Sequence, residues 1–319
     1  MNRVIQVASL AGRAAASYAG RKQPLLGGVK LTHRCNLSCL HCPFWQRDQR
    51  SLTFPEVLDS LDGLRRLGVR FVIFEGGEPF LWRDGDHRLA DVIREARARF
   101  DFVGVTTNGT FPIDVDADAV WISIDGLRAT HDRIRGESFD TAIGHIEDST
   151  HPNLYAHMTI NALNQEEIPD LVAFMAPRVR GITLQLHYPY GVESDDGLRL
   201  SQRERLRVLN ELIRLKRAGA PLVDSLACLR ALRDGRWRCR PWLVASVDPD
   251  GALTRGCYVR NRGPVSCEAC GFAAHAELSL AFAGRPSAIR TGLKIFMPRK
   301  TRRGTGAPRA QASGETTPA

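Results

Sequence analysis

The sequence predicts an α/β protein: an open (βα)6 partial TIM barrel with a small Cys-rich C-terminal extension. The chain has 319 residues, of which 43% are apolar and 25% charged, as in ordinary globular proteins. Short apolar runs alternate about six times with amphipathic segments, which is typical of strands and helices in a parallel sheet. Six units are too few for a closed eight-stranded barrel. The alternation stops near residue 219, where a cysteine-rich segment begins.

Each predicted strand is a short apolar run, and most are followed by a segment with helical spacing of apolar residues. The predicted strands are Gly28–Thr32, Phe71–Phe74, Phe102–Thr106, Val120–Ile124, Tyr155–Ile160 and Ile182–Leu186. The predicted helices are Pro55–Leu67, Asp86–Phe100, Thr141–Glu147, Glu166–Met175 and Gln202–Arg217. Thr53 and Gly68 are start and stop signals of the first helix. The crossover between the third and fourth strands has no clear pattern.

The chain divides into four predicted segments. Residues 1–26 form a basic amphipathic segment, residues 27–218 the partial barrel, and residues 219–280 the Cys-rich region. Residues 281–319 form a basic, largely disordered tail, because Gly, Pro, Thr and Arg dominate its end. Parallel barrels place their active sites at the carboxyl ends of the strands, so we expect the functional residues there.

Positive charge is concentrated at the two ends of the chain. The net charge is +9; residues 1–47 carry seven basic and no acidic side chains, and residues 278–319 carry eight basic side chains against Glu315. The body between them is net acidic, which argues against a DNA-binding domain. The basic ends fit an anionic membrane surface, an RNA or a merely solubilising tail. Arg13 interrupts the nearest candidate signal peptide, so we expect a cytoplasmic protein.

The chain has eight cysteines, which are predicted to serve mainly as metal ligands rather than to form disulfides, since a reducing compartment keeps thiols free. Three of them, Cys35, Cys39 and Cys42, follow the first predicted strand. Three thiolates can hold three corners of a [4Fe–4S] cluster and leave one iron open for a ligand. The alternative is zinc, with His33 or His41 as the fourth ligand.

The cysteine loop resembles the CxxxCxΦC motif of the radical S-adenosylmethionine (SAM) superfamily, where Φ is usually aromatic. Cys35, Cys39 and Cys42 match its cysteines, and His41 stands at the Φ position. The resemblance implies that these cysteines bind a [4Fe–4S] cluster whose fourth iron is chelated by SAM. It also implies that His41 lies near the adenine.

The end of the second strand, residues 75–79, resembles the GGE motif of the same family. Gly76 and Gly77 would let the backbone approach SAM closely. The resemblance implies that the Glu78 carboxylate accepts from the SAM ammonium group. Gly-Gly-Glu-Pro alone is an ordinary turn, but here it follows the cysteine motif and ends a buried strand.

Three weaker motifs follow the next strands: residues 107–109 and 123–126 resemble the family's TNG and SxDG segments, and asparagines follow the fifth strand. The resemblance implies four further SAM-binding residues: Asn108, Ser123, Asp125 and Asn164. Ser123 and Asp125 would contact the ribose. Gln185 and His187, at the end of the sixth strand, are expected to face the cavity.

The Cys-rich region resembles the SPASM and twitch extensions of the family, which bind auxiliary clusters. The implied ligands of a second [4Fe–4S] cluster are Cys239, Cys257, Cys267 and Cys270. Asp250 and Gly251 predict the hairpin that brings two of them together. Five residues rather than four separate Gly251 from Cys257, and a full two-cluster cysteine set is missing. A structural zinc knuckle is the alternative, and Cys228 is interpreted as a core residue.

The resemblance implies reductive cleavage of SAM and hydrogen abstraction from an unactivated carbon, with electrons from a flavodoxin-type or ferredoxin-type donor. Apolar residues interleaved with basic ones favour a membrane lipid as substrate and a peripheral membrane contact. They are Val4, Ile5, Val7, Leu10, Ala14 and Tyr18 near the N-terminus, and Ile289, Leu293, Ile295, Phe296 and Met297 near the C-terminus. The alternatives are maturation of a ribosomal peptide and, in another class, a zinc-binding RNA-interacting protein.

Overall fold

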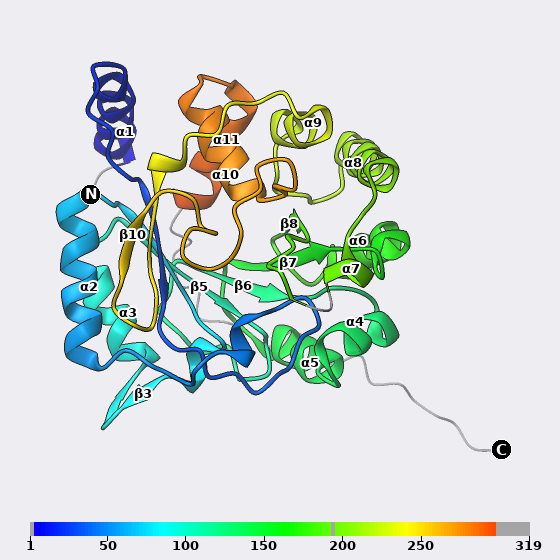
Figure 1. Ribbon diagram of the computed structural model, residues 1–319, viewed down its shortest axis with the longest axis horizontal. Helices are drawn as coiled ribbons and strands as arrows, with labels where there is room; N and C mark the ends of the chain where they lie inside the picture. Colours follow the sequence, from blue (N-terminus) through cyan, green and yellow to red (C-terminus); the bar gives the residue numbers. More distant parts are fainter. Residues whose placement is uncertain (1–2, 193–194, 298–319) are drawn as a thin grey trace.

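The computed structural model of the protein describes residues 3–192 and 195–297 and contains one open sheet of eight strands (Figure 1). The strand order is β10-β9-β1-β2-β5-β6-β7-β8, and every neighbouring pair is parallel except β9 and β10. The strands are β1 (Leu26–Lys30), β2 (Phe71–Glu75), β5 (Phe102–Thr107), β6 (Ala119–Ser123), β7 (Leu154–Ile160), β8 (Gly181–Leu186), β9 (Val244–Val247) and β10 (Leu253–Arg255). All six predicted strands are present, and the predicted fold class is confirmed.

Helices follow most of the strands, as the alternation predicts. They are α1 (Arg3–Tyr18), α2 (Phe54–Leu67), α3 (Leu89–Arg97), α4 (Arg128–Arg135), α5 (Phe139–Asp148), α6 (Ile168–Met175), α7 (Asp195–Leu198), α8 (Gln202–Arg217), α9 (Leu226–Asp234), α10 (Ala273–Phe282) and α11 (Pro286–Phe296). The helix predicted from Asp86 begins only at Leu89, because a small hairpin of β3 (Arg83–Asp84) and β4 (His87–Arg88) occupies its first turn. Among the described residues, no helix has both the length and the apolar character needed to span a bilayer.

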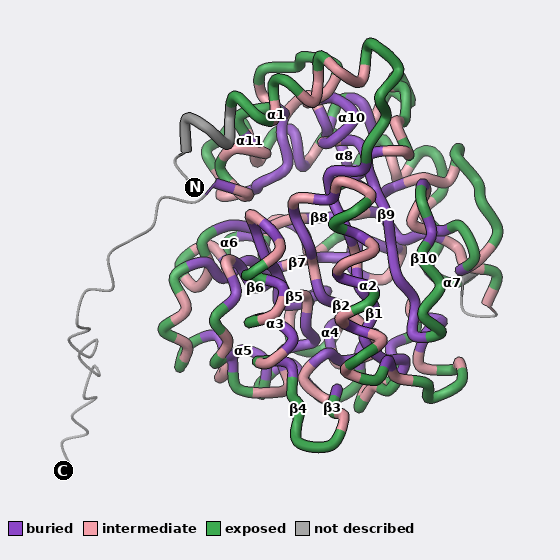
Figure 2. Tube along the Cα trace, turned by 90° about the vertical axis from the view of Figure 1, so that its left-hand side faces the viewer, coloured by how far each residue is buried: buried purple, intermediate pink, exposed green. Residues whose placement is uncertain are grey.

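Alternation along the strands decides which residues face the functional site. Val72 and Phe74 of β2 join the main core under the outer helices, whereas Phe71, Ile73 and Glu75 point to the other face of the sheet. We call this second face the inner face. Helices α10 and α11 cover part of it, and the strands are among the most buried parts of the chain (Figures 1 and 2).

The predicted Asp250–Gly251 hairpin forms, and it extends the barrel sheet. Gly251 N donates to Asp248 O at 2.9 Å in the turn, and β9 runs parallel to β1 with Val244 beside Leu26. The Cys-rich region therefore begins on the same sheet as the partial barrel. The four-segment division of the chain stays a prediction.

The expected disorder from residue 281 onward is wrong for α11. Phe296 stacks on Phe71 with ring centroids 4.5 Å apart, and this burial fixes the helix. Much of the apolar stripe predicted to enter a membrane turns inward: Leu10 and Leu293, for example, line the cavity described below, whereas Tyr18 and Ile289 are exposed. The side chains of residues 4, 5 and 7, and residues 298–319, lie outside the described residues.

Candidate functional site

The loop that carries the first three cysteines follows β1 and is anchored by the turn after β2. Gly77 N donates to Thr32 O at 2.6 Å, and Glu78 N donates to Arg34 O at 2.8 Å. A Cβ atom on Gly77 would lie 2.2 Å from Arg34 O, and one on Gly76 would lie 2.9 Å from Thr32 O. The two glycines are therefore required by packing against the cysteine loop. Their predicted approach to SAM stays a prediction.

Glu78 is fully buried, and its carboxylate is bonded inside the chain. It accepts from Thr107 Oγ1 at 2.9 Å, Asn108 N at 2.8 Å and Phe80 N at 3.1 Å. Burial raises the pKa of Glu78 to about 7, although these donors oppose the shift. The side chain ties the end of β5 to the turn after β2 and is not among the cavity-lining residues. Its predicted bond to the SAM ammonium group stays a prediction.

Cys35, Cys39 and Cys42 lie together at one end of a cavity that all three line. Burial raises the pKa of Cys39 to about 12; the Cys42 and Cys35 thiols add to the shift, and Arg135 opposes it. Arg135 Nη1 donates to Cys39 Sγ at 3.8 Å, and Asn108 Nδ2 donates to Cys35 Sγ at 3.9 Å. Buried thiols of this kind ionise when a bound metal offsets their charge.

The spacing of these sulfurs suits an iron–sulfur cluster better than one zinc ion. Among the described residues, the three do not come within 4.8 Å of one another as a set, whereas tetrahedral zinc with bonds of about 2.3 Å would hold them about 3.8 Å apart. His33, one candidate fourth ligand, bonds to Asp48 through Nδ1 and has no partner for its buried Nε2 among the described residues, but it is not among the residues that line the cavity with the cysteines. His41 lines the cavity, and its buried Nδ1 has no partner among the described residues. This donor set fits a cuboidal cluster with an open iron.

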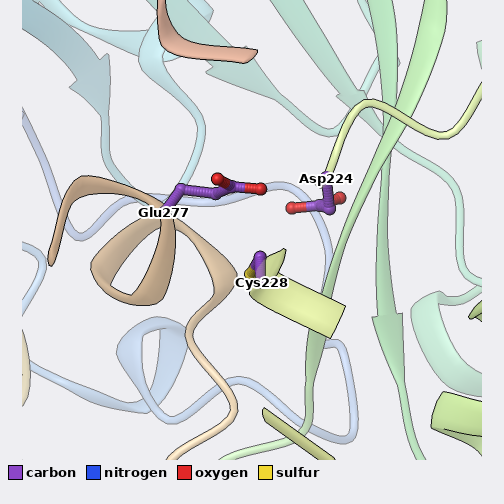
Figure 3. A group of neighbouring side chains, drawn as sticks. All are labelled: Asp224, Cys228 and Glu277. Carbon is purple, nitrogen blue, oxygen red and sulfur yellow. The ribbon is translucent and has the colours of Figure 1, made fainter. Parts of the chain in front are cut away.

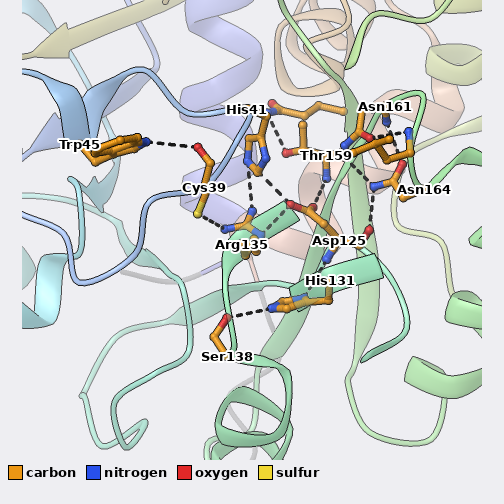
Figure 4. A network of polar contacts seen from close by, with 12 residues as sticks. Cys39, His41, Trp45, Asp125, His131, Arg135, Ser138, Thr159, Asn161 and Asn164 are labelled. Atoms are coloured by element: carbon orange, nitrogen blue, oxygen red, sulfur yellow. Dashed lines mark hydrogen bonds and ion pairs between the residues drawn. The ribbon is translucent and has the colours of Figure 1, made fainter. Parts of the chain in front are cut away.

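A buried ion pair lies beside the cysteine loop (Figure 4). Arg135 Nε donates to Asp125 Oδ2 at 2.6 Å, and Thr159 N donates to Asp125 Oδ1 at 2.7 Å. Burial alone would raise the pKa of Asp125, but Arg135 and these contacts hold it below its usual range. His41 Nε2 lies 3.7 Å from Asp125 Oδ2, and burial lowers the pKa of His41 to about 3, so the imidazole is neutral at pH 7. Sequence reasoning missed Arg135, because no pattern in one sequence separates it from the other arginines of α4.

The side chains of Asn164 and Asp125 make hydrogen bonds within the protein. Asn164 Nδ2 donates to Asp125 O at 2.7 Å and to Thr159 O at 3.0 Å, and Asn164 Oδ1 accepts from Asn161 N at 2.8 Å. These bonds join the ends of β6 and β7, and neither Asn164 nor Asp125 is among the cavity-lining residues. Their predicted SAM contacts stay predictions. The predicted SAM-binding residues that do line the cavity are His41, Gly76, Gly77, Asn108 and Ser123.

The cavity has a volume of about 610 Å³ and follows the inner face of the sheet. Near the cysteines its wall is polar and includes Ser123, His157, Thr159 and Gln185, which lie at or near the carboxyl ends of their strands. The prediction that Gln185 faces the cavity is confirmed, whereas His187 is buried but not among the lining residues. Burial lowers the pKa of His157 to about 4, so this polar end carries a neutral imidazole.

A second buried charge network joins β1 and β2 to the Cys-rich region. Lys30 Nζ lies 3.4 Å from Glu75 Oε1 and donates to the Tyr258 hydroxyl at 3.3 Å. Arg262 pairs with Asp248 at 2.9 Å and with Glu75 at 3.5 Å. Burial lowers the pKa of Lys30, while Glu75 opposes the shift. Sequence reasoning missed this network, since its members are far apart in the chain.

The four later cysteines also converge. Burial raises the pKa of Cys239 to about 11, and the Cys270, Cys257 and Cys267 thiols add to the shift, so the four groups lie close enough to interact. Cys239 and Cys267 are exposed, whereas Cys257 and Cys270 are partly buried and pack beside Phe272 in a small aromatic cluster. The structure therefore brings the predicted auxiliary ligands together at the outer part of the fold. The ligand set itself stays a prediction.

Cys228 is a core residue that lies beside two acidic side chains (Figure 3). One ligand atom each of Asp224, Cys228 and Glu277 falls within 4.8 Å of the others. Burial raises the pKa of Asp224 to about 7 and of Glu277 to about 8. Cys228 Sγ donates to Ala273 O at 3.6 Å, which fits a protonated thiol. Asp224 and Glu277 line the cavity, well away in the chain from the first cysteines.

The sequence and the fold both match known proteins. Residues 29–175 match the family model described as Radical SAM superfamily. The chain is 32% identical over 157 residues to pre-heme d1 synthase of Dinoroseobacter shibae, which covers 44% of this chain and 38% of that protein. It is 30% identical over 180 residues to the mycofactocin maturase MftC of Mycolicibacterium smegmatis, covering 52% and 45%. The chain thus spans less than half the length of these two relatives.

Among solved structures, Streptococcus suis SuiB bound to S-adenosylmethionine superposes with a TM-score of 0.61 at 15% identity, covering 81% of this chain and 67% of that chain. SuiB bound to its precursor peptide SuiA gives a TM-score of 0.59 at 14% identity, covering 86% and 70%. At this level of identity the likeness shows a shared fold. The first cysteine motif lies at the start of the region that the family model matches.

Proposed function

Because residues 29–175 place the chain in the radical SAM superfamily, we propose that it is an enzyme that cleaves SAM and abstracts a hydrogen atom from an unactivated carbon of its substrate. The observation that carries this proposal is the placement of Cys35, Cys39 and Cys42 at one end of a single cavity. The cofactors of the family are a [4Fe–4S] cluster and SAM. When bound, the cluster supplies the electron that splits SAM into methionine and a 5′-deoxyadenosyl radical.

The chain's own residues bind and position these groups. Cys35, Cys39 and Cys42 hold three irons, and Arg135 offsets negative charge at Cys39 through its contact with the sulfur. His41 is neutral and offers its unpartnered Nδ1 to the adenine. The polar wall at the strand ends orients SAM by hydrogen bonds, and the surrounding sheet and helices exclude water from the reacting atoms.

We further propose that Cys239, Cys257, Cys267 and Cys270 hold an auxiliary [4Fe–4S] cluster. The other three thiols add to the raised pKa of Cys239, and Cys257 and Cys267 add to that of Cys270, which supports this placement. The buried network of Lys30, Glu75 and Arg262 would separate the two clusters by a charged, hydrogen-bonded layer. A flavodoxin-type or ferredoxin-type donor would supply electrons at the exposed side of the cysteine loop, where Leu40 is 41% exposed.

Two of the similar proteins favour a ribosomal peptide as substrate, whereas pre-heme d1 synthase is named for a different product. MftC is named a maturase, and SuiB is known in complex with its precursor peptide. These names support a peptide maturase more than they support an enzyme that acts on membrane lipids. Membrane contact through the basic ends gains little support from the structure, because Leu10, Ala14 and Phe296 line the cavity. Of the stripe residues whose side chains are described, Tyr18 and Ile289 alone are exposed.

One structural observation keeps a hydrophobic substrate as the second candidate. The cavity is continuous from the three cysteines to Phe71, Leu278 and Phe296, and most of its wall is apolar. A substrate with a large apolar part would bury that part there. This candidate requires an apolar substrate and does not require a membrane.

The central test is SAM cleavage by anaerobically reconstituted protein with dithionite. The wild type should form 5′-deoxyadenosine, and the variant C35A/C39A/C42A should fall to background, because no other described cysteines line this end of the cavity. The same variant should keep about four irons per chain at the auxiliary site. Product is measured by chromatography and iron by colorimetry.

The matched control is Cys228→Ala, which removes a thiol from the core and should leave both SAM cleavage and iron content unchanged. Full SAM cleavage by the triple variant would overturn the radical SAM assignment of these cysteines. Zinc in place of iron at the retained site would overturn the auxiliary cluster alone.

A further inference from the structure

The end of the cavity opposite the cysteines is built differently from the cysteine end. Leu26, Phe71 and Val244 stand side by side at the starts of β1, β2 and β9, whereas Lys30 and Glu75 pair at the ends of β1 and β2. The cysteine loop follows Lys30, so the strand starts mark the far end of the cavity. At 3.3 Å per residue the two ends of β1 are about 13 Å apart.

Three helices close this far end, and they do so with apolar side chains. The lining residues are Leu10 and Ala14 from α1, Leu278, Ala281 and Phe282 from α10, and Ile289, Leu293 and Phe296 from α11. Protein interiors are normally packed without voids larger than a water molecule. An apolar space left open in such a wall therefore points to a ligand.

Two glycines leave room in the cavity, Gly292 in its far half and Gly28 midway along β1. A Cβ atom added to Gly28 on β1 would have Glu75 Oε1, at 3.7 Å, as its nearest neighbour, and one added to Gly292 on α11 would meet nothing within 4 Å. Both residues line the cavity. The whole cavity of about 610 Å³ is about four times an engineered apolar cavity that holds benzene.

Three polar groups of the far half are hydrogen-bonded within the chain. A fourth lining group, His275, is uncharged at pH 7 because burial lowers its pKa to about 4. Asp224 accepts from Leu184 N at 3.0 Å, and Glu277 accepts from Ser225 Oγ at 3.0 Å. Thr291 Oγ1 donates to Val223 O at 3.2 Å. A peptide backbone placed here would bring an N–H and a C=O group per residue into an apolar wall, at a cost in unpaired hydrogen bonds. A hydrocarbon chain brings neither.

We propose that the far half of the cavity binds the hydrocarbon chain of an amphiphilic substrate, with the polar part and the reactive carbon at the cysteine end. This inference rests on the proposed function for the position of the reaction. The wall changes from polar to apolar along β1, and this change sets the direction in which the hydrocarbon chain lies. The raised pKa values of Asp224 and Glu277 support the proposal, because they reduce the charge that these carboxyl groups place in the wall near neutral pH.

The test uses reconstituted holoenzyme and cis-parinaric acid, a fluorescent C18 fatty acid, as the probe of the far half. The wild type should bind it saturably at one site per chain. Gly292→Phe fills the far half and should weaken binding at least tenfold. Gly144→Phe is the matched control, since Gly144 is a glycine of α5 with nothing within 4 Å of an added Cβ and lies outside the cavity; it should bind within twofold of the wild type.

A second filling variant, Ala281→Phe on α10, gives the same test if Gly292→Phe fails to fold by circular dichroism. Saturable binding that both filling variants keep, or its absence from the wild type, would overturn the proposal. So would displacement of the probe by acetyl-Leu-Phe-Leu-amide more strongly than by hexadecanol, which would favour a peptide. SAM cleavage is measured in parallel. If the wild type does not cleave SAM but still binds the probe, the proposed function is wrong and the hydrocarbon-binding site stands.

Discussion

The two ends of the cavity bury charged groups in different ways. At the cysteine end, two carboxylates are paired with cations: Asp125 with Arg135 at 2.6 Å and Glu75 with Lys30 at 3.4 Å. A third, Glu78, is held by three hydrogen-bond donors instead of a cation. At the far end, Asp224 and Glu277 have no ion-pair partner among the described residues. Burial instead raises their pKa values to about 7 and about 8.

This difference teaches how the fold separates two tasks. A paired carboxylate stays charged, so the cysteine end keeps fixed positive groups beside sulfurs that must become thiolates. An unpaired carboxyl in an apolar wall keeps its proton, since desolvation disfavours the charged form. The ion pairs thus keep charge beside the cysteines, whereas the far end has no such pair among the described residues and its wall is mostly apolar.

The largest effect is expected from Gly77→Ala, which disrupts the contacts that anchor the cysteine loop. The added Cβ would lie 2.2 Å from Arg34 O, so the loop must move and its cysteines move with it. Misplacement by about 1 Å can cost 100-fold in rate, and we expect at least that loss of 5′-deoxyadenosine formation. Gly144→Ala, which meets nothing within 4 Å, is the control. Normal activity of Gly77→Ala would show that the loop tolerates displacement.

The second prediction tests the ion pair between Arg135 and Asp125. Arg135→Gln leaves Asp125 buried without its cation and should lower the free energy of unfolding by about 3–5 kcal/mol. The exposed Arg133 lies on the same helix, and Arg133→Gln should change stability by less than about 0.5 kcal/mol. Anaerobic denaturant titration of the two reconstituted variants measures the difference. Equal stability would mean that Arg135 does not stabilise Asp125.

The fold was predictable from the sequence because its strands are short apolar runs with turn residues at their ends. The capping box of α2 shows why: Thr53 Oγ1 accepts from Glu56 N, and Glu56 accepts from Thr53 N, as local signals predict. The helix predicted from Asp86 started three residues too early, because a hairpin turn at Gly85 competes there. The sequence did not predict helix α11, because its position depends on the contact between Phe296 and Phe71, which lie far apart in the chain.

The cysteine site was predictable as far as its residues are close in the chain. The loop of Cys35, Cys39 and Cys42 carries its ligands within eight positions, so spacing alone suggested a metal. Arg135 and Lys30 were not predictable, since their roles arise from partners 96 and 45 residues away, namely Cys39 and Glu75. The open far half also has no local signature, because it arises where α1, α10 and α11 meet the inner face of the sheet.

The smallest effect is expected in the pH dependence of the free energy of unfolding, which tests the unpaired carboxyl of Asp224 at the far end. An unfolded aspartate ionises near pH 3.9, whereas folded Asp224 keeps its proton to about pH 7. The free energy of unfolding should therefore fall as pH rises from about 4 to about 7, by at most about 1.4 kcal/mol per pH unit from this group. Asp224→Asn keeps an oxygen acceptor for Leu184 N but cannot ionise, so the slope should become shallower and the variant should gain most at pH 7. The exposed Asp148→Asn should keep the wild-type slope. Unfolding titrations at pH 5, 6 and 7 decide this, and an unchanged slope in Asp224→Asn would mean that Asp224 is charged and that the far end is less apolar than its lining indicates.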